Sequence, residues 1–344
     1  MPEILYRKWR PRSFGDLAGQ EHVAQTLTNA LSTGRVAHAY LFAGPRGTGK
    51  TSTGRLLGKA LNCTDRRDGE PCNVCPSCVD FLAGRAMDLI ELDAASNRGI
   101  DEIRSLREKV AFAPSGDYKV YLIDEVHMLT DAAFNALLKT LEEPPPHVVF
   151  ILATTEAHKL PATIASRCQR FDFRRIPVAA AVATLEKICE GEGFTCESAA
   201  LELIARSATG SLRDATNLLD QMATSYGKQL TLDQVRAGLG LIGDERSGSL
   251  ARIALSDDLG AGLALIASVR DDGLDLRQFQ KELIEELRAL LMVKSGLDPD
   301  EGVTQERRRD LEAAVASVPV PRLLAALRAF GEADLKQDPR ALYA

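Results

Sequence analysis

The stretch "GPRGTGKT", Gly44 to Thr51, has the residue types and the spacing to hold a phosphate group. It matches the pattern G-x-x-x-x-G-K-[ST] and lies between an apolar run and a helical pattern, which is the context that this loop requires. Its glycines allow backbone N–H groups to surround phosphate oxygens, and the following helix directs its positive end at them. Lys50 would reach the β- and γ-phosphates, and the Thr51 hydroxyl would hold Mg²⁺. The predicted nucleotide-binding residues of the loop are Gly44, Pro45, Arg46, Gly47, Thr48, Gly49, Lys50 and Thr51.

A pair of acidic residues follows another apolar run in the stretch "KVYLIDEVHML". Asp124, at the end of the run, suits the Mg²⁺ shell, and Glu125 suits polarisation of a water that attacks the nucleotide. An acidic pair after a strand can also cap a helix, but the phosphate loop favours the catalytic interpretation. His127 lies one turn past the pair, and we expect a helix-face or interface residue there rather than a base.

Four of the seven cysteines are clustered, and they are Cys63, Cys72, Cys75 and Cys78. The spacing C-x-x-C-x-x-C, with one further thiol upstream, lets tight turns present all four thiolates to one tetrahedral ion. Four thiolates leave no open coordination position, so the pattern predicts a structural Zn²⁺ site rather than a catalytic one. An iron–sulfur cluster is the alternative, because four cysteines also ligate such clusters.

The elements that must position these groups are short apolar runs that alternate with helical patterns. Strands are predicted at 39–43, 88–92, 119–123, 148–155 and, more weakly, 169–173. Because the runs are continuously apolar, they indicate a buried parallel sheet with helices on both faces, and hence an α/β fold. Helices are predicted at 50–61, 94–110 and 131–143. From about residue 176 helical periodicity takes over, and a glycine-rich break follows at 238–249.

Length, composition and charge limit the class of protein. A chain of 344 residues with 45% hydrophobic and 26% charged residues is typical of a globular protein with two or three domains. The net charge of −6 argues against a protein that binds nucleic acid through bulk positive charge, although a local row of basic groups could still face DNA. The apolar runs are too short to cross a bilayer and the N-terminus lacks the apolar stretch of a signal peptide, which predicts a cytoplasmic location without a membrane partner.

Several stretches together resemble the gamma/tau family of bacterial DNA polymerase III clamp-loader subunits, which are AAA+ ATPases. They are "YRKWRPRSFGDLAGQEHV", "HAYLFAGPRGTGKTS", "YLIDEVHMLTDAAFNALLKTLEEPP", "FILATTEAHKLPATIASRCQRF" and "GSLRDA". The resemblance runs to about residue 240, and beyond it only the helical pattern is compatible.

The resemblance implies three domains. They are an AAA+ P-loop core with a parallel five-stranded sheet at 1–175, a helical lid at 176–242, and a helical collar for oligomerisation at 243–344. A small zinc module at about 62–80 is inserted in the core. The chain stops in a segment that could continue as helix, which indicates a truncated collar.

The resemblance also implies roles for single residues. Thr155 in "LATTE" falls at the sensor-1 position, where a polar side chain touches the γ-phosphate or its water. Arg167 in "SRC" falls at the arginine-finger position, which acts in trans on the ATP of the neighbouring subunit. Arg213 in "GSLRDA" falls at sensor 2 and would reach the nucleotide from the lid. Arg98 is a candidate for contact with DNA phosphate, because it lies near the start of a predicted helix whose dipole would assist it.

The function implied by the resemblance is that of an ATP hydrolase in the clamp loader of the polymerase, with ATP, Mg²⁺ and Zn²⁺ as cofactors. The complete holoenzyme is associated with DNA-directed DNA polymerase activity. The implied partners are further copies of the chain, delta-type loader subunits, the sliding clamp and primer–template DNA. Two alternatives stay open: a non-hydrolysing AAA+ scaffold of the same loader, and a related AAA+ helicase or helicase loader.

Overall fold

The computed structural model describes residues 4–110, 112–239, 245–256, 258–272, 275–298 and 305–333. It divides into two compact units, Met1–Val235 and Arg236–Ala344, and each is described by itself. The predicted boundary between residues 175 and 176 falls inside the first unit, so separate core and lid domains stay a prediction. The predicted boundary between residues 242 and 243 lies outside the described residues.

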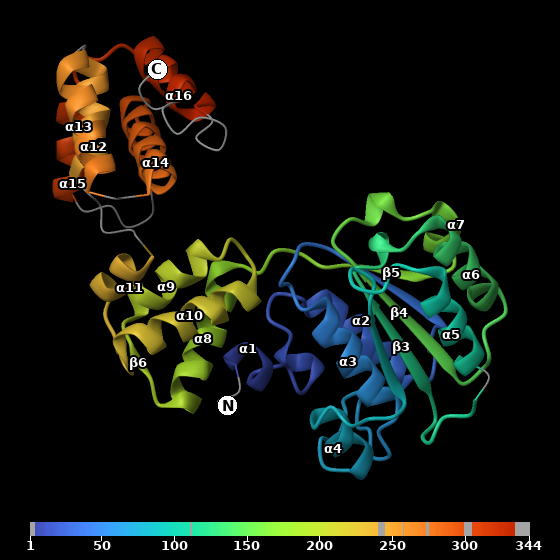
Figure 1. Ribbon diagram of the computed structural model, residues 1–344. Helices are drawn as coiled ribbons and strands as arrows, with labels where there is room; N and C mark the ends of the chain where they lie inside the picture. The colour runs from blue at the N-terminus through green and yellow to red at the C-terminus, as the bar shows by residue number, and fades with distance from the viewer. Residues whose placement is uncertain are drawn as a thin grey trace. The chain divides into compact units, whose positions relative to one another are not determined.

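A parallel five-stranded sheet forms the centre of the first unit, in the order β2-β3-β4-β1-β5 (Figure 1). Its strands are β1 (Ala39–Ala43), β2 (Leu89–Asp93), β3 (Lys119–Asp124), β4 (Val148–Thr154) and β5 (Gln169–Asp172). The five predicted strands are therefore confirmed to within one residue at each end. The three central strands are continuously buried apart from the ends of β3, whereas the edge strands β2 and β5 are partly exposed.

The helices before and between these strands are α1 (Leu5–Lys8), α2 (Glu21–Ser32), α3 (Lys50–Leu61), α4 (Pro76–Leu82), α5 (Ile100–Val110), α6 (Asp131–Glu142) and α7 (Ala162–Ala165), with short 3-10 turns η1 (Phe14–Asp16), η2 (Val126–Met128) and η3 (Ala157–Lys159). In Figure 1, α2 and α3 lie on one face of the sheet and α5, α6 and α7 on the other.

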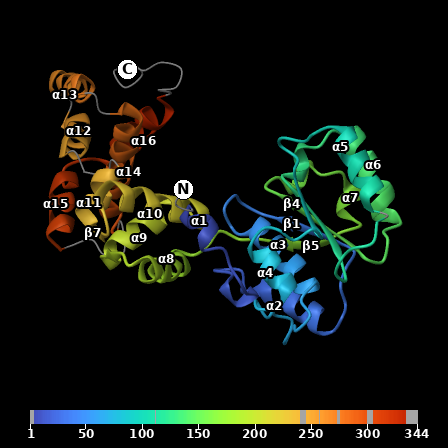
Figure 2. The same ribbon diagram turned by 60° about the horizontal axis from the view of Figure 1, so that its bottom comes forward.

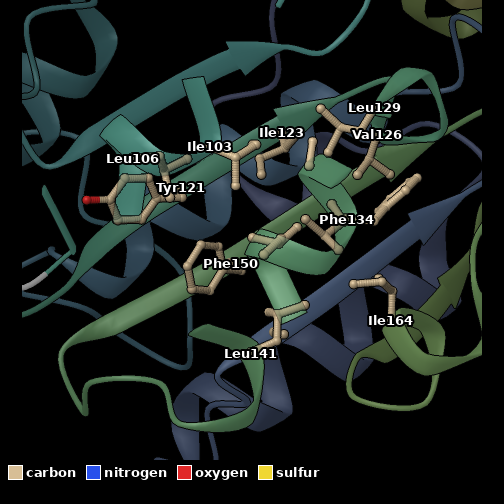
Figure 3. Packing of buried hydrophobic residues seen from close by; sticks show 14 of the residues in the cluster. Ile103, Leu106, Tyr121, Ile123, Val126, Leu129, Phe134, Leu141, Phe150 and Ile164 are labelled. Carbon is tan, nitrogen blue, oxygen red and sulfur yellow. The ribbon is translucent and has the colours of Figure 1, made fainter. Parts of the chain in front are cut away.

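Two apolar layers bury the two faces of the sheet. Successive residues of β3 point to opposite faces, so Val120 and Leu122 pack against α2 and α3 while Tyr121 and Ile123 pack against α5 and α6. Figure 3 shows the second layer, in which the rings of Tyr121 and Phe150 stack with their centroids 5.4 Å apart. Burial on both faces is the reason that the strands read as continuous apolar runs.

Two of the three predicted helices in this part have the expected bounds, and one begins later. The helix predicted at 94–110 is α5, which starts only at Ile100. The carboxylate of Asp93 accepts hydrogen bonds from the backbone of Ala95 and the hydroxyl of Ser96, and these bonds hold the chain in a turn before the helix. Side-chain bonds of this kind compete with helix formation, which accounts for the late start.

The rest of the first unit is helical, as predicted from residue 176 onward. It contains α8 (Val178–Glu192), α9 (Ser198–Ser207) and α10 (Leu212–Tyr226), and α11 (Leu232–Gly238) spans the boundary between the units. A parallel pair of two-residue strands, β6 (Thr195–Cys196) and β7 (Gln229–Leu230), was not predicted, since two residues are too few to show a period. Helix α1 lies against α10 (Figure 2).

The second unit is a helical bundle with its own apolar core. Its described helices are α12 (Glu245–Ser256), α13 (Leu259–Asp271), α14 (Leu276–Lys294), α15 (Gln305–Val315) and α16 (Val320–Glu332). Leu283, Leu287 and Leu290 of α14 are buried at the centre of this core.

Among the described residues, no single helix is long and apolar enough to cross a membrane. One pair, Arg307–Val315 with Val320–Glu332, has the length and composition only when joined across a bend of 104°.

The sheet core generates a stability prediction. Phe150 is fully buried, whereas Phe112 is 65% exposed, so the same substitution can be compared at both sites. We expect Phe150→Ala to lower the free energy of unfolding of the first unit by about 3–5 kcal/mol through lost burial and a residual cavity. Phe112→Ala should lower it by less than about 1 kcal/mol. Denaturant unfolding followed by circular dichroism measures both, and equal losses would contradict the layered core.

Candidate functional site

A cavity of about 690 Å³ lies at the edge of the sheet where β1 and β3 end. Parallel strands place their carboxyl ends at one edge, which is the usual position of a ligand site in such sheets. The wall combines the phosphate loop, the acidic pair, the N-terminal segment and the helical part of the first unit. Its members include Tyr6, Arg7, Trp9, Arg10, Arg46, Gly47, Thr48, Gly49, Lys50, Thr51, Asp124, Glu125, Ile188, Arg213 and Thr216.

The phosphate loop connects β1 to α3 in a conformation that needs its glycines. Gly44, Gly47 and Gly49 all have positive φ values, of 151°, 74° and 100°. A Cβ on Gly44 would come within 2.4 Å of the carbonyl oxygen of Phe173, and one on Gly49 would meet no atom within 4 Å. The loop is therefore packed on the protein side at Gly44 and open at Gly49, as a cradle for a phosphate must be.

Lys50 and Thr51 begin α3 and face the end of β3. Lys50 is 5% exposed, and its ammonium donates to the carbonyl oxygens of Gly44 and Pro45, at 2.8 and 2.7 Å. Burial lowers the pKa of Lys50, and the carboxylates of Glu125 and Asp124 oppose that shift. The Thr51 hydroxyl donates to Oδ2 of Asp124 at 2.6 Å. A hydroxyl and a carboxylate at this separation are hard oxygen donors, and they fit a Mg²⁺ ion.

Glu125 lies in the cavity wall on a strained backbone. Its φ and ψ of 47° and 45° are in the left-handed region, which costs about 1–2 kcal/mol for a residue other than glycine. Its carboxylate Oε2 accepts hydrogen bonds from the Thr155 hydroxyl at 2.9 Å and from the Thr155 backbone N–H at 3.3 Å. Thr155 follows the last residue of β4 and thus reaches the cavity through Glu125.

His127 is buried in the turn η2, next to the acidic pair. Its ring contacts Thr154, Glu125 and Glu156, and only 6% of its side chain is exposed. It therefore lies against Glu125, behind the cavity wall, and its contacts are with carboxylates and a threonine hydroxyl rather than with a helix surface. The sequence could not show this, because Thr154 and Glu156 come from a different strand end.

Arg213 lines the cavity from the second position of α10. Its guanidinium lies over the ring of Tyr6, 4.7 Å from the ring centroid, in a cation–π contact. A cation near a helix N-terminus opposes the helix dipole, so this position does not favour an arginine for the stability of the helix. Tyr6 and Arg213 thus line the same part of the cavity wall, although they are more than 200 residues apart in the sequence.

The start of α10 also contacts the phosphate loop directly, which the sequence did not reveal. The backbone N–H of Leu212 donates to the carbonyl oxygen of Gly47 at 3.0 Å. A Cβ on Gly47 would come within 1.9 Å of the Ser211 hydroxyl oxygen. Gly47 is therefore required by the approach of α10 as well as by the turn. Gly47 and Ser211 are far apart in the sequence, so no local sequence pattern could predict that they meet.

The N-terminal segment is anchored to α8. The indole N–H of Trp9 donates to Oε1 of Glu192 at 2.6 Å, and Lys8 forms an ion pair with the same carboxylate at 2.7 Å. A Cβ on Gly191 would come within 2.1 Å of the Trp9 ring, so the ring needs a glycine there. The wall formed by "YRKWRP" is thus fixed to the helical part of the first unit.

Two of the predicted arginines lie outside the cavity wall. Arg167 follows α7, forms an ion pair with Glu142 at 2.6 Å and donates to the carbonyl oxygen of Thr163 at 2.7 Å. Arg98 is exposed in the turn before α5 and donates to the carbonyl oxygen of Ala95. Neither arginine reaches the cavity of its own chain.

The four clustered cysteines converge just beyond the end of α3. The Sγ atoms of Cys63, Cys72, Cys75 and Cys78 all lie within 4.8 Å of one another. Tetrahedral Zn²⁺ with Zn–S bonds of about 2.3 Å separates its sulfur ligands by roughly 3.8 Å, and the sulfurs of Cys72 and Cys78 are 4.0 Å apart. The thiol set therefore fits one tetrahedral ion.

Backbone donors favour the thiolate form of Cys72 and Cys75, whereas burial raises the pKa of Cys63 and Cys78. Each of three sulfurs accepts a backbone N–H from the next cysteine along the chain, at 3.3–3.4 Å. Burial acts to raise the pKa of Cys75, but hydrogen bonds from Cys78 and Thr64 outweigh it and lower that pKa to about 6. The buried ammonium of Lys59 bonds to Asn73, between these cysteines, which adds a positive charge beside the thiols. Such an environment suits a closed structural site.

Two family descriptions match this chain. "DNA polymerase III, delta subunit" matches residues 19–177, and "DNA polymerase III clamp loader subunit, ATPase lid domain" matches residues 181–229.

Curated relatives cover most of the chain. It is 47% identical over 311 residues to the DNA polymerase III subunit tau of Bacillus subtilis, which covers 90% of this chain and 55% of that protein. It is 44% identical over 317 residues to the subunit tau of Escherichia coli, covering 91% and 49%. It is 39% identical over 292 residues to the subunit gamma of Buchnera aphidicola, covering 85% and 79%. The chain thus spans about half the length of the tau relatives.

Solved structures agree on the fold. The RuvB Holliday junction branch migration motor of Thermotoga maritima superposes with a TM-score of 0.52 at 20% identity, over 78% of this chain and 86% of that one. An identity this low bears on the fold alone, which is the AAA+ fold predicted from the phosphate loop and the resemblance. The family matches and the identities to the curated relatives show that this chain belongs to the gamma/tau family of DNA polymerase III clamp-loader subunits.

Proposed function

We propose that this chain is an ATP-driven motor subunit of a clamp loader. The observation that carries the proposal is the convergence of Lys50, Thr51, Asp124 and Glu125 on one cavity at the end of the sheet. ATP binding would order a ring of subunits that opens a sliding clamp and holds primer–template DNA, and hydrolysis would release the closed clamp. The partners are further copies of this chain, delta-type subunits, the clamp and the DNA. The cytoplasmic location stays a prediction from the sequence.

The residues of the cavity have separable tasks in this proposal. The loop N–H groups and the Lys50 ammonium bind the β- and γ-phosphates. The Thr51 hydroxyl and the Asp124 carboxylate, 2.6 Å apart, would hold Mg²⁺, which when bound neutralises charge on the phosphate oxygens. Glu125 accepts a hydrogen bond from the attacking water and orients it. Arg213 leaves the Tyr6 ring and turns toward the γ-phosphate.

Arg167 acts on the neighbouring subunit in this proposal. Its side chain is half-exposed and paired with Glu142, so it can be presented at a surface. An arginine that stabilises charge on a transferring phosphoryl group is worth about 10³–10⁵ in kcat. Its distance from the cavity of its own chain is compatible with action in trans.

The scaffold and helicase alternatives are less favoured. A scaffold without hydrolysis would not need a carboxylate such as Glu125 held on a strained backbone in the cavity wall. A helicase shares the phosphate site, but the four-cysteine insert and the "SRC" context are not expected in it.

The decisive experiment is the ATPase rate of the purified chain, alone and with loader partners, sliding clamp and primed DNA. We expect strong stimulation only with the full set, and its loss in Lys50→Ala, because that variant lacks the phosphate-binding ammonium. An equal rate without clamp and DNA would contradict the clamp-loader assignment, and no ATP binding at all would favour a scaffold.

A mixing experiment tests Arg167 in trans. Assemblies with only Lys50→Ala or only Arg167→Ala should both lose hydrolysis, by about 10³-fold or more for Arg167→Ala. Assemblies that contain both variants should regain a measurable fraction, since the Lys50→Ala subunit still offers its arginine to the ATP of the other. Arg170→Ala, an exposed arginine paired with Asp172, is the control and should keep the wild-type rate. If the mixed assemblies recovered no ATP hydrolysis, the proposed action of Arg167 in trans would be wrong.

We also propose that the four cysteines bind a structural Zn²⁺ ion. The closeness of their sulfurs and the backbone N–H donors to them support this proposal. The cluster lies at the opposite end of α3 from the phosphate loop, so its task is structural rather than catalytic.

Replacing one ligand separates folding from nucleotide binding. We expect about one zinc ion per chain by atomic absorption and near-complete loss in Cys75→Ser, with a lower unfolding temperature, since binding of a structural ion contributes to folding free energy. Folded Cys75→Ser should still bind ATP. Cys196→Ser, outside the cluster, should keep its zinc. Iron and visible absorption instead of zinc would support the iron–sulfur alternative, and loss of ATP affinity in a well-folded variant would overturn the structural role.

Arg98 is proposed to contact DNA phosphate. It is exposed in the turn before α5, where the helix N-terminus adds a positive field, although its guanidinium now bonds to Ala95. Arg104 is also exposed but pairs with Asp101 along the helix, so it serves as a matched control.

The salt dependence of DNA binding tests this contact. Arg98→Ala in the assembled loader should weaken primer–template binding and reduce the slope of log K against log salt by about 1, with ATP affinity unchanged. Arg104→Ala should leave the slope as it is. An unchanged slope and affinity in Arg98→Ala would refute the contact.

A further inference from the structure

The imidazole of His127 bridges three groups that come from two strand ends. Its Nδ1 lies 2.9 Å from the Thr154 hydroxyl oxygen and 3.4 Å from Oε2 of Glu125. Its Nε2 lies 3.1 Å from Oε2 of Glu156. The ring is buried, with 6% of the side chain exposed, whereas Glu125 and Glu156 are 31% and 37% exposed. The imidazole therefore forms an inner wall behind the two carboxylates.

Hydrogen-bond capacity decides which way the ring donates. Lys159 bonds to Glu156 and holds its pKa below the ordinary value, so Glu156 is a carboxylate that can only accept. Nε2 must then carry a proton and donate to it. The Thr154 oxygen already accepts the backbone N–H of Glu156 at 3.0 Å, so it can still donate its proton to Nδ1. If Nδ1 is protonated as well, its N–H faces both Thr154 and Glu125.

In either case the ring is fixed from two sides, and its Nδ1 edge lies against the Glu125 carboxylate. A protonated Nδ1 can donate toward that carboxylate, whereas a neutral Nδ1 limits its movement by contact alone. The hydrogen bonds that described residues make to the Glu125 carboxylate all reach Oε2, and both come from Thr155. The imidazole closes the same side of the carboxylate at 3.4 Å. The other oxygen, Oε1, accepts no hydrogen bond from the described residues, and Glu125 lines the cavity. A general base needs this arrangement, with one oxygen anchored and the other directed at water.

We propose that His127 is a positioning residue that holds the Glu125 carboxylate in the orientation needed for ATP hydrolysis. The proposal rests on the hydrolase function proposed above. In this proposal His127 contacts neither the phosphate nor the attacking water. It acts through Thr154 and Glu125, and its link to Glu156 prevents the ring from turning away. A side chain that only filled space would not need both nitrogens bonded.

Three substitutions at His127 separate positioning from packing. In His127→Asn the amide occupies the place of Nδ1, so it can still bond to Thr154 and lie beside Glu125. In His127→Gln the amide occupies the place of Nε2 and reaches Glu156 only. His127→Ala keeps neither contact. His158→Asn is the matched control, because that imidazole is exposed in the turn after β4.

The assembled loader with clamp and primed DNA gives the kinetic measurement. We expect kcat to fall about tenfold or more in His127→Ala, with ATP affinity within about twofold of the wild type. His127→Asn should recover most of the loss, and His127→Gln less of it. His158→Asn should match the wild type. Equal losses in Asn, Gln and Ala variants, or a loss of ATP affinity parallel to kcat, would mean a packing role only and would overturn the proposal.

A double-mutant cycle tests whether His127 acts through Glu125. Glu125→Gln alone should nearly abolish hydrolysis, and adding His127→Ala should cause little further loss, because the group that His127 positions is already disabled. Additive losses would contradict positioning.

Nuclear magnetic resonance of the nucleotide-free chain supplies a readout without activity. The Nδ1 signal of His127 should move in Glu125→Gln and in Thr154→Val, while both ring signals of His158 stay unchanged. An unmoved Nδ1 signal would remove the contact on which the proposal stands. If the wild-type assembly itself hydrolysed no ATP, the hydrolase function would fail, whereas an active wild type with unaffected His127 variants would overturn this inference alone.

Discussion

The site depends on the parallel pairing of β1 and β3 with β4, because this pairing brings the phosphate loop and the proposed catalytic groups to one edge. Ala43 lies opposite Thr154, and Ile123 lies opposite Leu152, so the phosphate loop, Asp124 and Thr155 all leave the sheet at neighbouring points. The strands hold this register because both of their faces are buried, and a slip of one residue would turn each apolar set to the wrong layer. The stacked rings of Tyr121 and Phe150, which lie opposite each other on β3 and β4, are one contact that this register allows.

The helical part of the first unit is joined to this edge by a small number of specific contacts. Leu212 bonds to the backbone of Gly47, and Arg213 lies over Tyr6. The N-terminal segment that carries Tyr6 is itself bonded to Glu192 of α8 through Trp9. A ligand that moved the loop at Gly47 would therefore act on α10 through a backbone contact and on α8 through the N-terminal segment. The position of the phosphate loop is thus linked to that of α10 by direct contacts.

The sequence predicted most of the fold and the phosphate-binding half of the site for a physical reason. Strand and helix periods, the loop pattern and the cysteine spacing are local, and each needs only a few neighbouring residues. The bounds of the five strands followed from that. The late start of α5 did not, because it depends on which backbone groups the Asp93 side chain accepts. The pairings of Ser211 with Gly47 and of His127 with Thr154 and Glu156 join residues that no short-range pattern relates.

The cysteine module has a wider structural effect than its own loop. Glu70, between the first and second cysteines, accepts the backbone N–H groups of Phe14 and Gly15 at 2.8 and 3.0 Å. Lys59 donates to the carbonyl oxygen of Arg12 at 2.7 Å from the helix that leads to Cys63. These bonds hold the segment just after "YRKWRP", which forms one wall of the cavity. A metal ion that fixed the module would thus also steady this segment of the cavity wall, while the phosphate loop is held between β1 and α3.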